Sequence, residues 1–163
     1  MNSIGKILLA AIAAAGLATI VSFSAAAADV IEVSLTDTGA GVDMPKDLGM
    51  GMNGDMSKAT MGITVSKKQV KAGQVTFNVT NASKELIHEM LVAPVADVSK
   101  PLPFIANDFR VDEEAAKDLG EVSELDPGKS GSLTITLKPG IYILFCNIAG
   151  HYMAGMWTLI TAK

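Results

Sequence analysis

Cysteine and histidine are scarce in this chain of 163 residues, which has one cysteine and two histidines. A single cysteine excludes a disulfide within the chain. Basic residues are also in deficit, with 13 Lys and Arg against 17 Asp and Glu, a formal net charge of −4. Nucleic-acid binding needs a basic face, so we expect no nucleic-acid partner. No internal repeat is evident, which argues against a repeat architecture.

The N-terminal residues 1–28 have the pattern of a secretory signal peptide. One positive charge at Lys6 precedes an Ala-rich apolar run over residues 7–21, and small residues at 25–28 form a cleavage site. The alternative is an uncleaved membrane anchor, because the apolar run approaches a spanning length. The small residues and the polar Asp29 favour cleavage. We therefore expect an exported, periplasmic protein with no membrane span after cleavage.

Residues 29–163 have a length suited to one domain. Short segments of strand character alternate with turn signals such as Asp126-Pro127-Gly128, where Pro fixes φ and Gly takes a positive φ. Seven or eight strands with one short helix predict an all-β fold, a Greek-key β-sandwich. The expected strands are residues 31–35, 61–65, 75–79, 88–95, 121–125, 133–137, 142–146 and 156–161.

The predicted helix covers residues 111–119, with Asp112 as its N-cap and Gly120 as a possible C-cap. Pro94 is expected to end the strand at 88–95 or to place it at a sheet edge. Residues 36–60 are rich in Gly, Asp and Met and have no period. We expect this segment to be a long loop or a flap.

The most informative motif is C-x4-H-x4-M, formed by Cys146, His151 and Met156 just after an apolar strand. A thiolate, a thioether and an imidazole favour copper over magnesium, calcium or manganese. Two histidines, a cysteine and a weak axial methionine are the ligands of blue-copper sites, and His88 is the remaining histidine. Taken singly, a lone cysteine is more often a buried apolar residue, and methionines often fill cores. Their joint spacing favours a metal site.

The stretch from Tyr142 through Trp157 resembles the C-terminal ligand loop of the cupredoxins, most closely the rusticyanin and sulfocyanin type. Residues 74–81, a strand ending in Asn, followed by His88, are also similar to that family. The resemblance covers about residues 61–162. It implies a cupredoxin-like domain at 29–163 that holds one copper ion through four ligands, which are His88, Cys146, His151 and Met156.

Two positions depart from the family pattern. Glu89 follows the first histidine, where many members have a small polar residue. An ionised carboxylate close to copper would stabilise Cu(II), whereas one directed into solvent would have no effect. Ile87 stands where a glycine would accompany a fifth, carbonyl ligand. Asn147, next to the cysteine, is placed to hydrogen-bond around the site.

The expected function is that of a small blue copper electron carrier, a monomer that meets redox partner proteins. The alternative is a periplasmic copper-binding protein for storage, delivery or resistance, which would meet copper-handling proteins. An enzyme is not expected, since four protein ligands leave no open position on the metal. Five methionines support the alternative if they load Cu(I), but an apolar flap is the favoured interpretation. They are Met44, Met50, Met52, Met56 and Met61.

Overall fold

The structure is a computed structural model that describes residues 28–163. The signal peptide predicted at residues 1–28 therefore lies, except for its last residue, outside the described residues. Within residues 28–163, no helix is long and apolar enough to cross a membrane.

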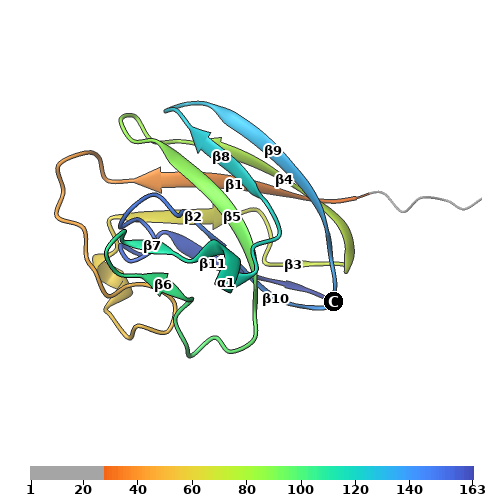
Figure 1. The fold of residues 1–163 in the computed structure, drawn as a ribbon. Coiled ribbons are helices and arrows are strands. Elements are labelled where there is room, and N and C mark those ends of the chain that lie inside the picture. The colour runs from red at the N-terminus through yellow and green to blue at the C-terminus, as the bar shows by residue number, and fades with distance from the viewer. Residues whose placement is uncertain (1–27) are drawn as a thin grey trace, which may run out of the picture.

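Two β-sheets face each other and form the predicted sandwich (Figure 1). The four-stranded sheet has the order β2 (Met61–Val65), β1 (Asp29–Asp37), β4 (Gly73–Asn81), β9 (Ser130–Leu137). The five-stranded sheet has the order β3 (Gln69–Val70), β11 (Trp157–Ala162), β10 (Gly140–Phe145), β5 (His88–Val95), β8 (Glu121–Leu125). A small hairpin joins β6 (Phe104–Ile105) and β7 (Arg110–Val111). The sandwich prediction is confirmed, and the strands it lacked are the two-residue strands β3, β6 and β7.

Alternating side chains of the two sheets meet in one apolar core. Every second residue of β1 and β4 points inward, as the period of a strand requires. Each such side chain contributes about 1.5–3 kcal/mol to stability when fully buried. Core residues from the two sheets include Ile31, Leu35, Val75, Phe77, Val79, Met90, Val92, Leu144 and Ile160.

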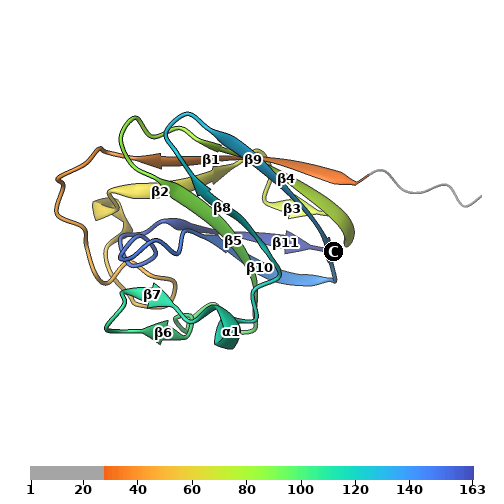
Figure 2. The same ribbon diagram turned by 45° about the horizontal axis from the view of Figure 1, so that its top comes forward.

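A second apolar cluster covers the outer face of the five-stranded sheet. It includes Leu91 and Ala93 of β5 and Ile143 and Phe145 of β10. Strands covered on both faces have continuous apolar runs, which explains why β5 and β10 lose their alternation. Figure 2 shows the β6–β7 hairpin and helix α1 below this sheet.

The helix is shorter than predicted. Helix α1 covers only Glu113–Ala116, because Val111 pairs with β6 before it and the Leu119 N–H donates to the Val92 carbonyl after it. Asp112 is the predicted N-cap and accepts a hydrogen bond from the N–H of Ala115. The C-cap prediction was wrong: Lys117, with φ of 57°, takes the left-handed position rather than Gly120. Pairing within the hairpin has overridden helix propensity here.

Pro94 does not end its strand. It pairs with Tyr142 on one side, whereas β8 pairs only as far as Leu91 on the other side. The proline lies beyond the end of β8. No neighbouring strand of the described residues is present there to accept a hydrogen bond, so the missing N–H costs nothing.

Residues 38–60, here called the methionine segment, lie across the end of the sandwich where β10 leads into β11 (Figure 1). Leu48 and Met50 are buried, and a 3-10 helix covers Met56–Lys58. The Leu48 N–H donates to the Met153 carbonyl at 2.9 Å. The Leu48 carbonyl accepts from the Trp157 indole at 2.7 Å. The segment is thus fastened to the loop that carries the C-x4-H-x4-M motif.

Candidate metal centre

The loop between β10 and β11 folds back so that its two ends meet. The Cys146 N–H donates to the Met156 carbonyl at 3.1 Å, and the Met156 N–H donates to the His151 carbonyl at 3.1 Å. Gly150 and Gly155 have φ of 85° and 96°, values that favour glycine. These turns bring Cys146, His151 and Met156 close together, although ten residues separate the first from the last.

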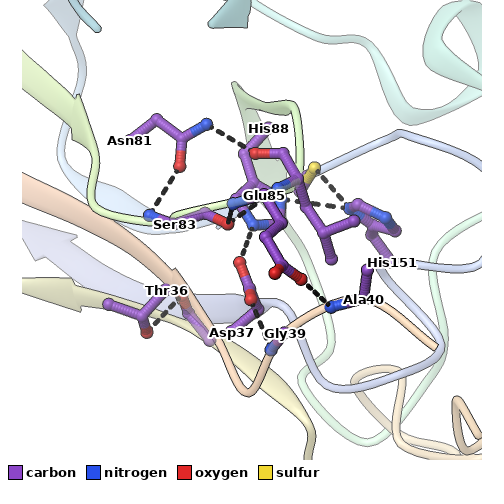
Figure 3. Close-up of polar contacts among 12 residues, drawn as sticks. Thr36, Asp37, Gly39, Ala40, Asn81, Ser83, Glu85, His88 and His151 are labelled. Carbon is purple, nitrogen blue, oxygen red and sulfur yellow. Dashed lines mark hydrogen bonds and ion pairs between the residues drawn. The ribbon is translucent and has the colours of Figure 1, made fainter. Parts of the chain in front are cut away.

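His88 reaches the same place from β5, the neighbour of β10 in the same sheet. It opens β5 after a loop that the buried Asn81 holds together. The Asn81 amide donates to the carbonyls of Leu86 and Leu125 at 2.8 and 2.7 Å, and its oxygen accepts from the Ser83 N–H at 2.9 Å. The strand-ending asparagine therefore fixes the path of the chain into His88 (Figure 3).

A β-bulge follows His88. The pairing of β5 with β8 shifts between His88 and Met90, so Glu89 has no partner in the ladder. Its free N–H donates instead to the Cys146 sulfur at 3.5 Å. The extra residue of the bulge lies on β8, where Ser123 and Glu124 stand opposite Glu89. Glu89 therefore alternates with Leu91 and Ala93 of the outer cluster, whereas His88 alternates with Met90 and Val92 of the inner core.

Three of the predicted ligands converge. The Nδ1 atoms of His88 and His151 are 3.2 Å apart, and the Cys146 sulfur is 3.4 Å from Nδ1 of His151 (Figure 3). The ligand atoms of all three residues lie within 4.8 Å of one another. With metal–nitrogen bonds of about 2.0 Å, nitrogens 3.2 Å apart subtend about 105° at a shared ion. A thiolate with two imidazoles at this spacing suits one copper ion.

Met156 is the fourth predicted ligand. Its side chain is fully buried and belongs to the same apolar cluster as Cys146. Its backbone adjoins Cys146 through the hydrogen bond described above. That its sulfur binds the metal stays a prediction.

No protein family and no curated protein matches the sequence, but solved structures match the fold. Auracyanin B is 21% identical over 86% of this chain and 93% of its own, with a TM-score of 0.52. Rusticyanin from Thiobacillus ferrooxidans is 16% identical over 84% of this chain and 79% of its own, with a TM-score of 0.52. The chain has the cupredoxin fold.

Without a metal ion, Cys146 of this cupredoxin fold is a neutral thiol rather than a thiolate. Burial raises the pKa of the Cys146 thiol to about 12, so the metal-free protein holds a thiol at neutral pH. Burial and the neighbouring His88 lower the pKa of His151 to about 4. A neutral His151 has a free lone pair for a metal ion, whereas Cys146 must release a proton to become a ligand.

Asp37, at the end of β1, is a site residue that sequence reasoning missed. Its Oδ2 lies 2.8 Å from Nε2 of His88, and its Oδ1 accepts from the Gly39 N–H at 2.7 Å. Burial alone would raise the pKa of Asp37, but hydrogen bonds from Ser83, His88 and Gly39 lower it below its usual value. The only signal in the sequence was an Asp before a Thr-Gly turn, which many loops share.

Glu89 is buried rather than directed into solvent. Its Oε1 has no hydrogen-bond partner among the described residues. Burial, followed by the nearby Glu121 carboxylate, raises the pKa of Glu89 to about 7. The carboxyl group therefore keeps its proton to a higher pH than an exposed glutamate does.

Asn147 holds the loop against β7 rather than bonding to the sulfur. Its side-chain oxygen accepts from the Val111 N–H at 2.6 Å, and its amide donates to the Val111 carbonyl at 3.0 Å and to Glu113 at 2.7 Å. The residue after the cysteine thereby fixes where β10 ends. Tyr142 and Leu144, which alternate in phase with Cys146, are buried in the same cluster.

Proposed function

We propose that this protein is an exported type 1 copper protein that carries single electrons between redox partners. The observation that carries the proposal is the convergence of His88, Cys146 and His151 at one end of a cupredoxin-fold sandwich. Nothing else in the described chain brings three potential metal ligands of these types together.

In this proposal His88, Cys146 and His151 would hold the copper, and Met156 would be a weaker fourth ligand. Bound copper supplies one-electron exchange between Cu(I) and Cu(II). The protein's part is to keep the ligands still. Cys146 and Met156 are fully buried and fixed at strand ends, and His88 is enclosed by the sandwich. A rigid ligand set limits the change of geometry that accompanies each electron.

Electrons would enter and leave through His151, which is the histidine closer to the surface. A shallow apolar cavity of about 220 Å³ adjoins it, lined by Met44, Phe109, Ala149, Gly150 and Met153 with Pro45 and Lys46. An apolar surface allows brief contact without a large desolvation cost for charges. It suits a redox protein that docks and leaves.

Export to the periplasm rests on the signal peptide predicted at residues 1–28. We propose a monomer with one copper ion per chain and no enzymatic activity. Four protein ligands would leave no open position where a substrate could bind the metal.

Addition of Cu(II) to the purified mature protein tests the function. We expect one-to-one binding, an intense thiolate charge-transfer band toward the red end of the visible spectrum, and the EPR spectrum of a type 1 site. Cys146→Ser should remove the band, while Ser132→Ala, on the exposed face of β9, should keep it. A colourless complex with an ordinary tetragonal EPR spectrum would contradict the proposal.

Copper storage or delivery is the competing function, and the methionine segment was its support. Met50 of this segment and Met61, the first residue of β2, are buried in two different apolar clusters, at 2% and 6% exposure. Met44 and Met56 are exposed and contact different parts of the ligand loop, at Gly150 and Gly155. These positions favour a segment that packs over the ligand loop over one whose methionine sulfurs bind a single Cu(I).

A further inference from the structure

We propose that Asp37 is a positioning residue that keeps the proton of His88 on Nε2 and thereby presents a bare Nδ1 to the copper. This inference rests on the proposed function, because it concerns the same metal centre. It assigns a role to a residue outside the four ligands, supplied by a different strand.

Both oxygens of Asp37 are engaged with nitrogen donors. Oδ1 accepts from the Gly39 N–H at 2.7 Å, and Oδ2 lies 2.8 Å from Nε2 of His88 (Figure 3). The two side chains are almost completely enclosed, with exposures of 4% for Asp37 and 0% for His88. Water therefore cannot substitute easily for either partner.

A carboxylate can only accept hydrogen bonds, so Nε2 of His88 has to carry a hydrogen. In neutral imidazole the other nitrogen then has the free lone pair. That nitrogen is Nδ1, which faces Nδ1 of His151 at 3.2 Å inside the ligand cluster. The tautomer that Asp37 selects is thus the one that binding requires.

An amide at position 37 cannot meet both demands. If its oxygen accepts from the Gly39 N–H, its NH2 group faces Nε2 of His88, which must then accept and move its hydrogen to Nδ1. If the amide is turned round, the NH2 group meets the Gly39 N–H, and two donors face each other. Asp37→Asn is therefore a nearly isosteric change that disfavours the productive tautomer.

Glu85 offers a matched control. Its Oε2 accepts from the Ala40 N–H at 3.0 Å, one residue beyond Gly39, and no hydrogen bond joins it to a histidine. Glu85→Gln removes one negative charge from the same turn and keeps an acceptor oxygen for Ala40. Any effect of charge or of turn stability alone should appear in both variants.

The first measurement uses the metal-free protein with 15N-labelled histidine. Long-range proton–nitrogen NMR spectra distinguish the two tautomers. We expect the hydrogen of His88 on Nε2 in the wild type and in Glu85→Gln, and a shift toward Nδ1 in Asp37→Asn. Asp37→Ala, which removes the acceptor without adding a donor, should give a mixture and serves if the Asn variant does not fold.

The second measurement is copper binding by competition, with the reduction potential. Loss of a partner of a metal-binding histidine typically weakens metal affinity about 10- to 100-fold, and we expect this for Asp37→Asn but not for Glu85→Gln. The carboxylate favours Cu(II) over Cu(I), so the potential should rise, by about 59 mV for each tenfold loss confined to Cu(II).

Two outcomes would overturn the inference. One is a wild-type His88 with its hydrogen on Nδ1, and the other is an Asp37→Asn protein that matches Glu85→Gln in tautomer and in affinity. If the wild type binds no Cu(II), the proposed function fails, but the NMR result on metal-free protein still decides what Asp37 does to His88.

Discussion

The two histidines of the site stand in opposite surroundings. His88 opens a strand, is completely buried, and has one ring nitrogen hydrogen-bonded to Asp37. His151 lies on a loop at the rim, and among the described residues no hydrogen bond holds its Nε2. His88 therefore has polar contacts at both ring nitrogens, whereas His151 has them only at Nδ1.

This difference separates two tasks that one metal centre has to combine. The His88 side keeps the ligand geometry constant, because a strand, a bulge and a buried carboxylate surround it. The His151 side leads to the surface, where the ligand loop and the methionine segment meet. Rigidity and access are therefore supplied by different parts of the chain.

The sharpest way to break this comparison is to remove each ring in turn. His151→Gly should lose the colour and recover it when imidazole is added, because the gap opens near the surface. His88→Gly should not recover, and it should also lose about 1–3 kcal/mol of stability because Asp37 is left buried without its partner. Visible spectra during imidazole addition and thermal unfolding test both. Equal recovery in the two variants would remove the proposed difference.

The copper affinity should also depend on pH, through Cys146 and His151 of the ligand loop. Cys146, with a pKa of about 12, must release one proton on binding, so Cu(II) affinity should fall about tenfold per pH unit from pH 8 to pH 5. Below the pKa of His151, about 4, a second proton competes and the decline should steepen. Competition titrations across this range give the slope. A flat profile between pH 5 and 8 would show that the thiol is not a ligand.

Met156→Leu should change copper binding less than the loss of either histidine. Leucine conserves the volume of the side chain, so the fold should be kept. We expect copper to remain bound and the reduction potential to rise, because a weak donor to Cu(II) is lost. Voltammetry measures the change, with Met90→Leu as a core methionine control. Complete loss of copper would make Met156 a principal ligand, and an unchanged potential would exclude it from the ligand set.

The smallest effect is expected at the methionine segment. Met44 contacts Gly150 beside His151, and Met56 lies near Gly155. Replacing both with leucine should leave one Cu(I) per chain and the same visible spectrum. Our reason is that thioethers on an aperiodic loop must overcome ordering entropy before they converge on an ion. A wild-type titration that saturates at two or more Cu(I), with the excess lost in the variant, would favour copper handling.

The ligand loop could be predicted because its chemistry is local. Cys146, His151 and Met156 fall within eleven residues, and only one further histidine remained to complete the set. The sandwich was also predictable, because alternation in β1, β4 and β9 and the Pro-Gly turns are properties of short segments.

Asp37 and the bulge at Glu89 could not be predicted in this way. Asp37 meets a partner 51 positions away, and nothing beside it in the sequence marks that pairing. The bulge depends on how β5 aligns with β8, which is a property of two strands together. The same applies to the hairpin that shortens helix α1, since β6 decides whether residues 110–111 are helical.

The position of β11 bears on when the protein can acquire metal. β11 is an interior strand, paired with β10 over six residue pairs and with β3 on its other side, and it is the last strand in the chain. Three of the four proposed ligands lie on the loop just before it. A growing chain that does not yet contain this loop would offer His88 alone, a poor metal ligand by itself. Copper capture would therefore follow completion of the sheet. The lifetime of the folded, metal-free protein would then depend on the stability of the sandwich without its ion.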